Sequence, residues 1–141
     1  MVLRSVGVAC VAVISLVAFA LSGCSSDEQP DLAGTSWTLA SWAESAAIPD
    51  GVTITAAFDE TRVSGNSGVN TYFGEYERDG DGSFSAGPIG STMMAGPEDA
   101  MNAETAFAKR LEAAESYAVS GDQLVLKDAD GEDSLTFTAA D

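Results

Sequence analysis

Apolar and polar residues alternate along most of the chain, and this pattern predicts β-strands. The clearest case is the segment 52–58, in which Val52, Ile54, Ala56 and Phe58 are separated by smaller or polar residues. A period of two places successive side chains on opposite faces of a strand. The same pattern predicts further strands at residues 36–40, 62–64, 70–76, 83–86, 89–93, 117–120, 123–127 and 134–138.

One segment departs from this alternation and has a helical period instead. Residues 97–99 are Pro-Glu-Asp, and proline and acidic residues are typical of the first turn of a helix. Met101, Phe107, Leu111 and Ala114 then recur at helical spacing through an alanine-rich stretch. We therefore expect one amphipathic helix of about four to five turns. Its apolar face is expected to pack against the core rather than against a partner.

Together these elements predict an α+β domain with a mainly antiparallel sheet. The sheet is either curved or closed into a cracked barrel of about eight strands, with one amphipathic helix. Turns rich in glycine and aspartate join the strands, as at residues 79–82 and 128–131. The residues on the apolar face of each predicted element are expected to form the core. They are Trp37, Leu39, Ile54, Phe58, Phe107, Leu111, Leu124, Leu126, Leu135 and Phe137.

The first 24 residues follow a different pattern, which is that of a bacterial export signal. Arg4 precedes an apolar run over residues 5–21. Leu-Ser-Gly-Cys at residues 21–24 resembles a lipobox, in which the cysteine is lipidated and becomes the first residue after cleavage. A transmembrane helix is the alternative, but 17 residues are the lower limit for a span and no basic cluster follows.

These features divide the chain into three parts. We expect a signal peptide at residues 1–23, a lipidated Cys24 with a flexible tether at residues 24–32, and a folded domain at residues 33–139. The expected location is therefore the outer face of a bacterial cell membrane, to which the lipid anchors the protein.

The composition excludes several classes of function. Removal of residues 1–23 leaves five basic and 22 acidic residues, a formal charge of −17, which repels nucleic acid and anionic lipid headgroups. The chain has no histidine, and its two cysteines are Cys10 in the signal segment and Cys24. The mature chain therefore lacks a free thiol and the commonest general base and metal ligand. We expect a monomer with no cofactor, no metal ion and no nucleic-acid partner.

Two short motifs resemble catalytic or metal-binding loops, but their spacing is wrong. Residues 65–69 lack glycine in the fifth place of a nucleophile elbow, and no histidine could activate Ser67. Residues 128–133 resemble a calcium loop, but their glycine comes fourth where an EF-hand needs it sixth. Carboxylate pairs suited to glycoside hydrolysis arise by chance in so acidic a chain. We therefore predict that the protein is not an enzyme.

Five short segments of the chain stand out as motifs. They are Gly-Thr-Ser-Trp-Thr-Leu at 34–39, Val-Ser-Gly-Asn-Ser-Gly-Val-Asn-Thr-Tyr-Phe-Gly-Glu-Tyr at 63–76, Ser-Thr-Met-Met-Ala at 91–95, the helix positions Glu104, Phe107 and Leu111, and a hairpin with Tyr117 and residues 121–126. In this order they resemble the META domain, also called the HslJ-like domain, over residues 33–138. The resemblance implies a small cracked barrel that can hold a lipid chain, and a role in envelope stress or secretion.

The resemblance also implies a disulfide that this chain lacks. Relatives often have cysteine at the positions of Val69 and Gly96, and the absence of both here suggests that these positions face each other. Such a link would close a loop of about 28 residues and contribute roughly 3–4 kcal/mol in the chain-entropy model. In this chain, packing must supply that stability.

The densest part of the resemblance contains the candidate binding surface, which consists of Asn66, Asn70, Tyr72 and Tyr76. Their strand carries aromatic residues on both faces, so one face is left over once the core is filled. The alternative is a structural corner, in which Asn70 bonds loop backbone groups and the glycines at 65 and 68 allow close approach.

Three functional hypotheses follow. The first is a membrane-anchored binding module for an apolar ligand or an envelope protein, and a sizeable apolar pocket between sheet and helix would favour it. The second is a structural or interaction module without a small ligand, which a fully packed interior would favour. The third is a carboxylate-based hydrolase, which would need two close, buried carboxylates in a cleft.

Overall fold

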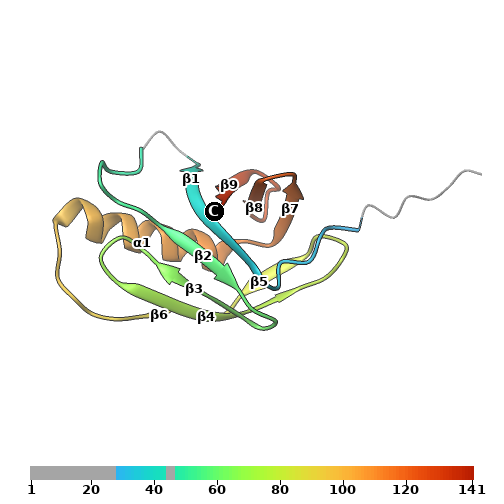
Figure 1. The fold of residues 1–141 in the computed structure, drawn as a ribbon, viewed down its shortest axis with the longest axis horizontal. Helices are drawn as coiled ribbons and strands as arrows, with labels where there is room; N and C mark the ends of the chain where they lie inside the picture. Colours follow the sequence, from blue (N-terminus) through green and yellow to red (C-terminus); the bar gives the residue numbers. More distant parts are fainter. Residues whose placement is uncertain (1–27, 44–46) are drawn as a thin grey trace, which may run out of the picture.

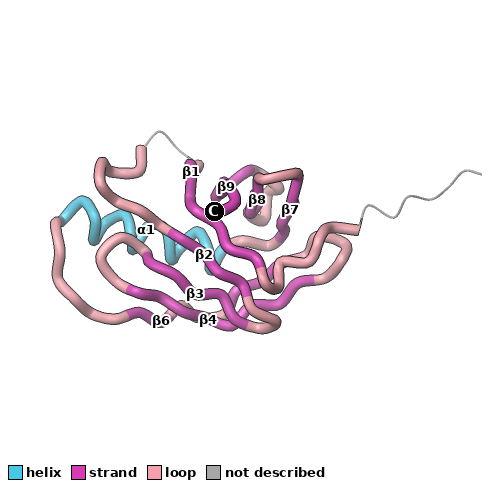
Figure 2. Tube along the Cα trace, in the orientation of Figure 1, coloured by secondary structure: helices cyan, strands magenta, loops and turns pink. Residues whose placement is uncertain are grey.

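The computed structural model describes residues 28–43 and 47–141 of the chain. The predicted signal peptide and the lipidation site at Cys24 lie outside these residues. The described chain forms nine strands and one helix (Figures 1 and 2). They are β1 Thr35–Trp42, β2 Thr55–Phe58, β3 Arg62–Asn66, β4 Thr71–Arg78, β5 Phe84–Ala86, β6 Gly90–Ser91, α1 Glu98–Ala113, β7 Ser116–Ser120, β8 Gln123–Lys127 and β9 Asp133–Ala139.

The strands form one antiparallel sheet that curls into a nearly closed barrel. Their order is β5-β4-β3-β2-β1-β9-β8-β7, and the short β6 pairs with β4. The two ends of this order approach each other, since Ser83 forms a bridge with Ser116 and the amide of Tyr117 donates to the carbonyl of Gly82 at 2.8 Å. The predicted α+β class with a mainly antiparallel barrel and one helix is confirmed.

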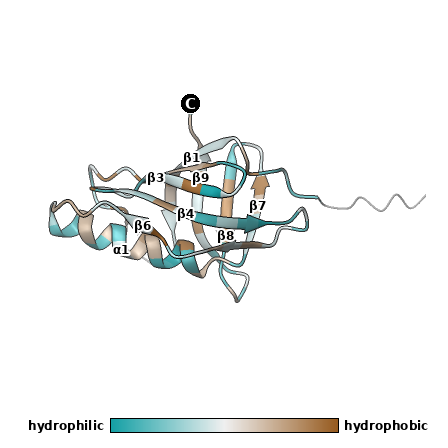
Figure 3. Ribbon diagram, turned by 90° about the horizontal axis from the view of Figure 1, so that it is seen from below, coloured by the Kyte–Doolittle hydropathy of each residue, from teal (hydrophilic) through white to brown (hydrophobic). Residues whose placement is uncertain are grey.

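The helix closes the open side of this barrel. Pro97 precedes it and two acidic residues, Glu98 and Asp99, occupy its first turn, as the sequence predicted. The ring of Phe107 lies 5.1 Å from that of Tyr72 in β4 and 6.4 Å from that of Phe137 in β9, measured between centroids. Helix α1 therefore packs against both halves of the sheet, and Figure 3 shows it lying along one side of the strands.

The predicted core is confirmed in full. All ten side chains predicted to be buried are between 0 and 7 % exposed. A second group of aromatic residues fills one end of the barrel, where Tyr76 stacks on Phe84 at 5.8 Å and Phe58 meets Tyr76 edge-on at 5.1 Å. The interior at this end is therefore packed rather than hollow.

The segment that leads into β1, expected to be part of a flexible tether, is docked onto this end of the barrel. The amide of Gln29 donates to the carbonyl of Gly80 at 2.8 Å, and its side-chain oxygen accepts from the amide of Val119 at 3.0 Å. Nη2 of Arg78 lies 2.6 Å from Oδ1 of Asp31. The folded unit thus begins at about residue 29, so a soluble form that starts at residue 25 contains every described strand, the helix and the docked segment.

Glycine at position 65 allows β2 and β3 to approach closely. An added Cβ at Gly65 would lie 2.2 Å from the carbonyl oxygen of Thr55, so no residue with a side chain fits there. Gly68, in the turn that follows, has a φ of +125°, which favours glycine. The predicted use of both glycines is confirmed, and it shapes the turn from which the site is built.

We predict that Phe107→Ala destabilises the domain by about 3–5 kcal/mol, because the ring is fully buried between the two halves of the sheet and its loss leaves a cavity. Urea denaturation of the soluble form measures the effect. Phe73→Ala is the matched control, because Phe73 is 50 % exposed, and it should cost about 1 kcal/mol or less. Equal midpoints for the two variants would contradict the packing of α1 described above.

Candidate functional site

An apolar pocket lies between α1 and the segment 89–95, which contains β6 and runs on toward the helix. Its volume is about 460 Å³, within the range of roughly 300–1,000 Å³ that is usual for small-ligand sites. Most of its lining is apolar, and a few polar groups lie at its floor and rim. The lining residues are Ser67, Asn70, Tyr72, Ile89, Ser91, Thr92, Met93, Met94, Ala95, Met101, Glu104, Thr105, Phe107, Ala108, Lys109 and Glu112.

Methionine gives this pocket its character. Met93, Met94 and Met101 all line it, and apart from Met1 they are the only methionines of the chain. Met93 is 96 % exposed and Met94 is 57 % exposed. Flexible, polarizable thioethers on a surface are typical of sites that adapt to varied apolar partners. The pocket is therefore suited to an apolar occupant whose shape need not be fixed.

The floor of the pocket is held by Glu104 of α1, which binds the turn between β3 and β4. Its Oε1 accepts from the backbone amide of Asn70 and from that of Val69, the latter at 2.8 Å. The same oxygen lies 3.0 Å from Oγ of Ser67. Its Oε2 accepts from Nδ2 of Asn70 at 2.9 Å. One carboxylate thus satisfies four donors of the turn and fixes the helix against it.

The side-chain amide of Asn70 extends this network to the opposite wall of the pocket. Its Oδ1 accepts from the amide of Met94 at 2.7 Å and from Oγ1 of Thr92 at 2.9 Å. Its Nδ2 also donates to the carbonyl of Met94 at 3.2 Å. The side chain of Asn70 therefore bonds Met94 where a neighbouring strand would otherwise supply a backbone partner. The prediction that Asn70 bonds loop backbone groups is confirmed. It also explains why β6 itself is only two residues long.

These contacts determine the charge state of Glu104. Burial raises the pKa of the carboxyl, but hydrogen bonds from Asn70, Val69 and Ser67 outweigh burial and hold the pKa below its ordinary value. Because the pKa is lower in the folded than in the unfolded state, the carboxylate contributes stability above the ordinary glutamate pKa of about 4.3. That contribution is lost as the pH falls through the folded-state value.

The structure separates the four residues predicted to form a binding surface. Asn66 is exposed, whereas Asn70, Tyr72 and Tyr76 are only 1–3 % exposed. Each tyrosine hydroxyl donates to a backbone carbonyl, at 2.7 Å for Tyr72 and 2.6 Å for Tyr76, and burial raises the pKa of both phenols. Asn70 and Tyr72 line the pocket from the inside, while Tyr76 packs in the aromatic group at the other end of β4.

Sequence reasoning missed the two walls of the pocket. The apolar stripe of the helix was assigned to the core, and Phe107 and Leu111 are indeed buried. Met101 and Phe107 of that stripe also line the pocket, as does Ala108 beside it. The missed signal was the adjacent pair of methionines at 93–94, because methionine is often used at binding surfaces that adapt to their partner.

Val69 and Gly96 face each other at the edge of this site. A Cβ built on Gly96 would lie 3.3 Å from Cβ of Val69 and 2.4 Å from its Cγ2. The first distance is close to the 3.5–4.5 Å that is usual across a disulfide. The methyl groups of Val69 therefore fill the space beside Gly96, where no side chain would fit. Packing takes the place of a covalent link.

Within residues 28–43 and 47–141, no three histidine, cysteine, aspartate or glutamate side chains converge on a possible metal position. The described helix is not long and apolar enough to cross a membrane.

These features define a small antiparallel barrel with one helix across its open side and an apolar pocket beside that helix. The sequence matches the model of the META domain over residues 30–141, so the chain belongs to the META domain family.

Solved structures share this fold. A protein from Burkholderia xenovorans, determined by NMR, is 31 % identical with a TM-score of 0.65, over 77 % of this chain and 83 % of that one. A DUF4847 family protein from Bacteroides vulgatus, determined by crystallography, is 17 % identical with a TM-score of 0.55, over 76 % and 93 % of the two chains. No curated protein matches the chain.

We predict that Glu104→Gln lowers the free energy of unfolding by about 1–3 kcal/mol at pH 7, because an amide cannot satisfy all the donors that the carboxylate binds. The difference between the wild type and the variant should begin to shrink as the pH falls below about 4.3, the ordinary glutamate pKa, and should be lost as the pH falls through the lower pKa that Glu104 has in the folded state. Urea denaturation from pH 3 to pH 7 measures it. A difference that stays constant over this range would show that the charge of Glu104 does not hold the helix.

Proposed function

We propose that this protein is an exported, lipid-anchored META-domain lipoprotein that binds an apolar ligand in the pocket between α1 and residues 89–95. It serves as a non-enzymatic binding module in the cell envelope, in envelope stress or secretion. The observation that carries the proposal is the apolar pocket itself, which lies in a domain whose remaining interior is filled by buried side chains.

The make-up of the pocket supports binding rather than catalysis. Its floor carboxylate, Glu104, already accepts from the donors of the β3–β4 turn and is held in its charged form, so it is poorly placed to move a proton. The chain has no histidine to act as a base. The methionines at the mouth add adaptable apolar surface, which favours capture of apolar groups from water.

The lipid anchor rests on the sequence of the first 24 residues. Cys24 follows the apolar run at the position where cleavage would make it the first residue. Cys24→Ala should leave an unprocessed precursor or release the domain from the membrane, because the thioether that carries the lipid cannot form. Membrane fractionation and mass spectrometry of the intact protein measure this. Unchanged mass and fractionation in the variant would overturn the proposed anchor.

Occlusion of the pocket tests the binding function. Ala108 lines the pocket, so Ala108→Phe should fill part of it and weaken binding of a naphthylamine fluorescent probe about tenfold or more, which corresponds to roughly 1.4 kcal/mol. Fluorescence titration of the soluble form measures the affinity. Ala113→Phe is the matched control, because Ala113 is an exposed residue of the same helix outside the pocket, and it should leave binding unchanged.

The two variants also separate binding from mere surface adhesion. Equal affinity in the wild type and in Ala108→Phe, at unchanged thermal midpoints, would mean that the probe binds elsewhere. The pocket would then not be the binding site, and a module without a small ligand would be the better description.

A further inference from the structure

Among the described strands, one edge of β6 has no partner. Within residues 28–43 and 47–141, β6 pairs only with β4. The alignment with β4 continues past its end, because the amide of Thr92 donates to the carbonyl of Thr71 at 3.0 Å and the amide of Met94 donates to Oδ1 of Asn70 at 2.7 Å. The backbone groups of these two residues therefore point toward β4.

Backbone groups of alternate residues in an extended segment point to opposite sides. The amide of Ile89 shows this directly, since it donates away from β4 to Oε1 of Glu112 on α1, at 2.9 Å. Ser91 and Met93 lie two and four residues after Ile89. Their backbone groups therefore point the same way as that of Ile89, to the edge that faces the helix. Both residues also line the pocket. The free edge and the apolar pocket thus belong to one groove between β6 and α1.

This combination selects among apolar ligands. An acyl chain can fill the apolar volume but cannot bond the backbone groups of Ser91 and Met93. An extended peptide does both, because its main chain pairs with a free strand edge while alternate side chains enter the pocket. Proteins usually cover an unpaired edge or block it with charge or proline. Glu112 covers this edge at Ile89, but Ser91 and Met93 are exposed and are neither charged nor proline.

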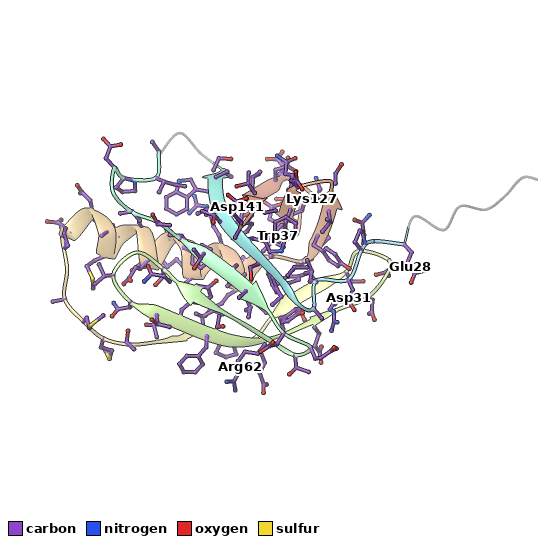
Figure 4. All side chains as sticks on the ribbon, in the orientation of Figure 1. Glu28, Asp31, Trp37, Arg62, Lys127 and Asp141 are labelled. Atoms are coloured by element: carbon purple, nitrogen blue, oxygen red, sulfur yellow. The ribbon has the colours of Figure 1, made fainter. Side chains whose placement is uncertain are left out.

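The position of the groove indicates where its ligand comes from. Glu28 and Asp31 lie at one end of the long axis, whereas the N-terminal half of α1 and residues 92–97 lie at the other (Figures 1 and 4). Because Gln29 is fastened to the barrel, the chain from it to the proposed lipid at Cys24 spans at most about 18 Å. The anchored end of the barrel is thus held near the membrane. The groove runs along α1 from Glu112 to Met101, and its Met101 end lies away from the proposed anchor, which favours a ligand from the aqueous compartment over a membrane lipid.

The proposal rests on the proposed binding function and names the ligand. We propose that the groove binds an extended, apolar segment of another exported protein, which adds as a strand to the free edge at Ser91 and Met93 and inserts alternate side chains between β6 and α1. The strongly acidic surface of the mature chain, with a formal charge of −17, favours segments that are flanked by lysine or arginine.

The test compares two substitutions at one exposed position. Met93→Pro removes the amide of the free edge while Met93→Leu keeps it, and both retain an apolar side chain. The probe is a capped, fluorescein-labelled peptide of alternating leucine and threonine with a lysine at each end, measured by fluorescence anisotropy with the soluble form. Peptide binding to Met93→Pro should be about tenfold or more weaker than to Met93→Leu, which keeps the amide of the free edge.

A second probe separates this inference from the binding function itself. The naphthylamine probe needs only the apolar volume, and both variants replace a pocket-lining methionine by another apolar side chain, so it should bind Met93→Pro and Met93→Leu with affinities within about twofold of each other. Two further peptides carry methyl groups on alternate amide nitrogens, one on the odd-numbered and one on the even-numbered residues. Only one of these two sets of amides faces the edge of β6, so one peptide should lose binding and the other should keep it. Equal peptide affinity in the proline and leucine variants would overturn the peptide proposal. Displacement of the naphthylamine probe by laurate, with no binding of the peptide, would also overturn it but would leave an apolar site. If only Ala108→Phe weakened both probes, the pocket would be supported and the strand addition overturned.

Discussion

The carboxylate of Glu104 is the contact on which the arrangement of this domain depends most. It comes from the middle of the only described helix and accepts hydrogen bonds from the turn between β3 and β4. A helix that packs on a barrel through apolar contacts alone could slide or rotate, since dispersion and burial are not directional. The charge-assisted bonds to Val69 and Asn70 fix both its position and its rotation.

Asn70 carries this constraint to the rest of the site. Its backbone amide and side-chain nitrogen bind Glu104, and its side-chain oxygen and nitrogen also bind the backbone of Met94. The helix, the β3–β4 turn and the segment after β6 are thereby joined through one buried amide. A groove with a defined width results, because its two walls are attached to the same floor. The candidate site is thus a consequence of how the helix is attached and needs no flexible loop to create it.

The residues at the edge of the site show that different interactions can meet one structural need. Val69 lies against Gly96 at a separation close to that of a disulfide, and its methyl groups fill the space that a bond would span. This junction joins the β3–β4 turn to the residues just before α1, next to the contacts of Glu104. In this chain, hydrophobic packing and a network of hydrogen bonds together hold a junction that the family resemblance associates with a covalent link.

The sequence by itself determined the elements and the side chains that fill the core. Alternation of apolar residues gave the strands, and the spacing of Phe107 and Leu111 gave the helix, because these periods follow directly from backbone geometry. The sequence also indicated that Asn70 would bond backbone groups and that glycine was needed at position 65, since each residue type has few alternative uses.

Only the tertiary structure decided where an accessible apolar surface remains. Tyr72 and Tyr76 are amphipathic, and their pattern fits a surface or an interior equally well. Their burial depends on backbone carbonyls of β2 and the following turn, which the fold brings to their hydroxyl groups. Met93 and Met101 lie on separate elements, and they share one pocket because Glu104 and Asn70 set the distance between those elements. Such distances arise from contacts between residues far apart in the chain, and no local period encodes them.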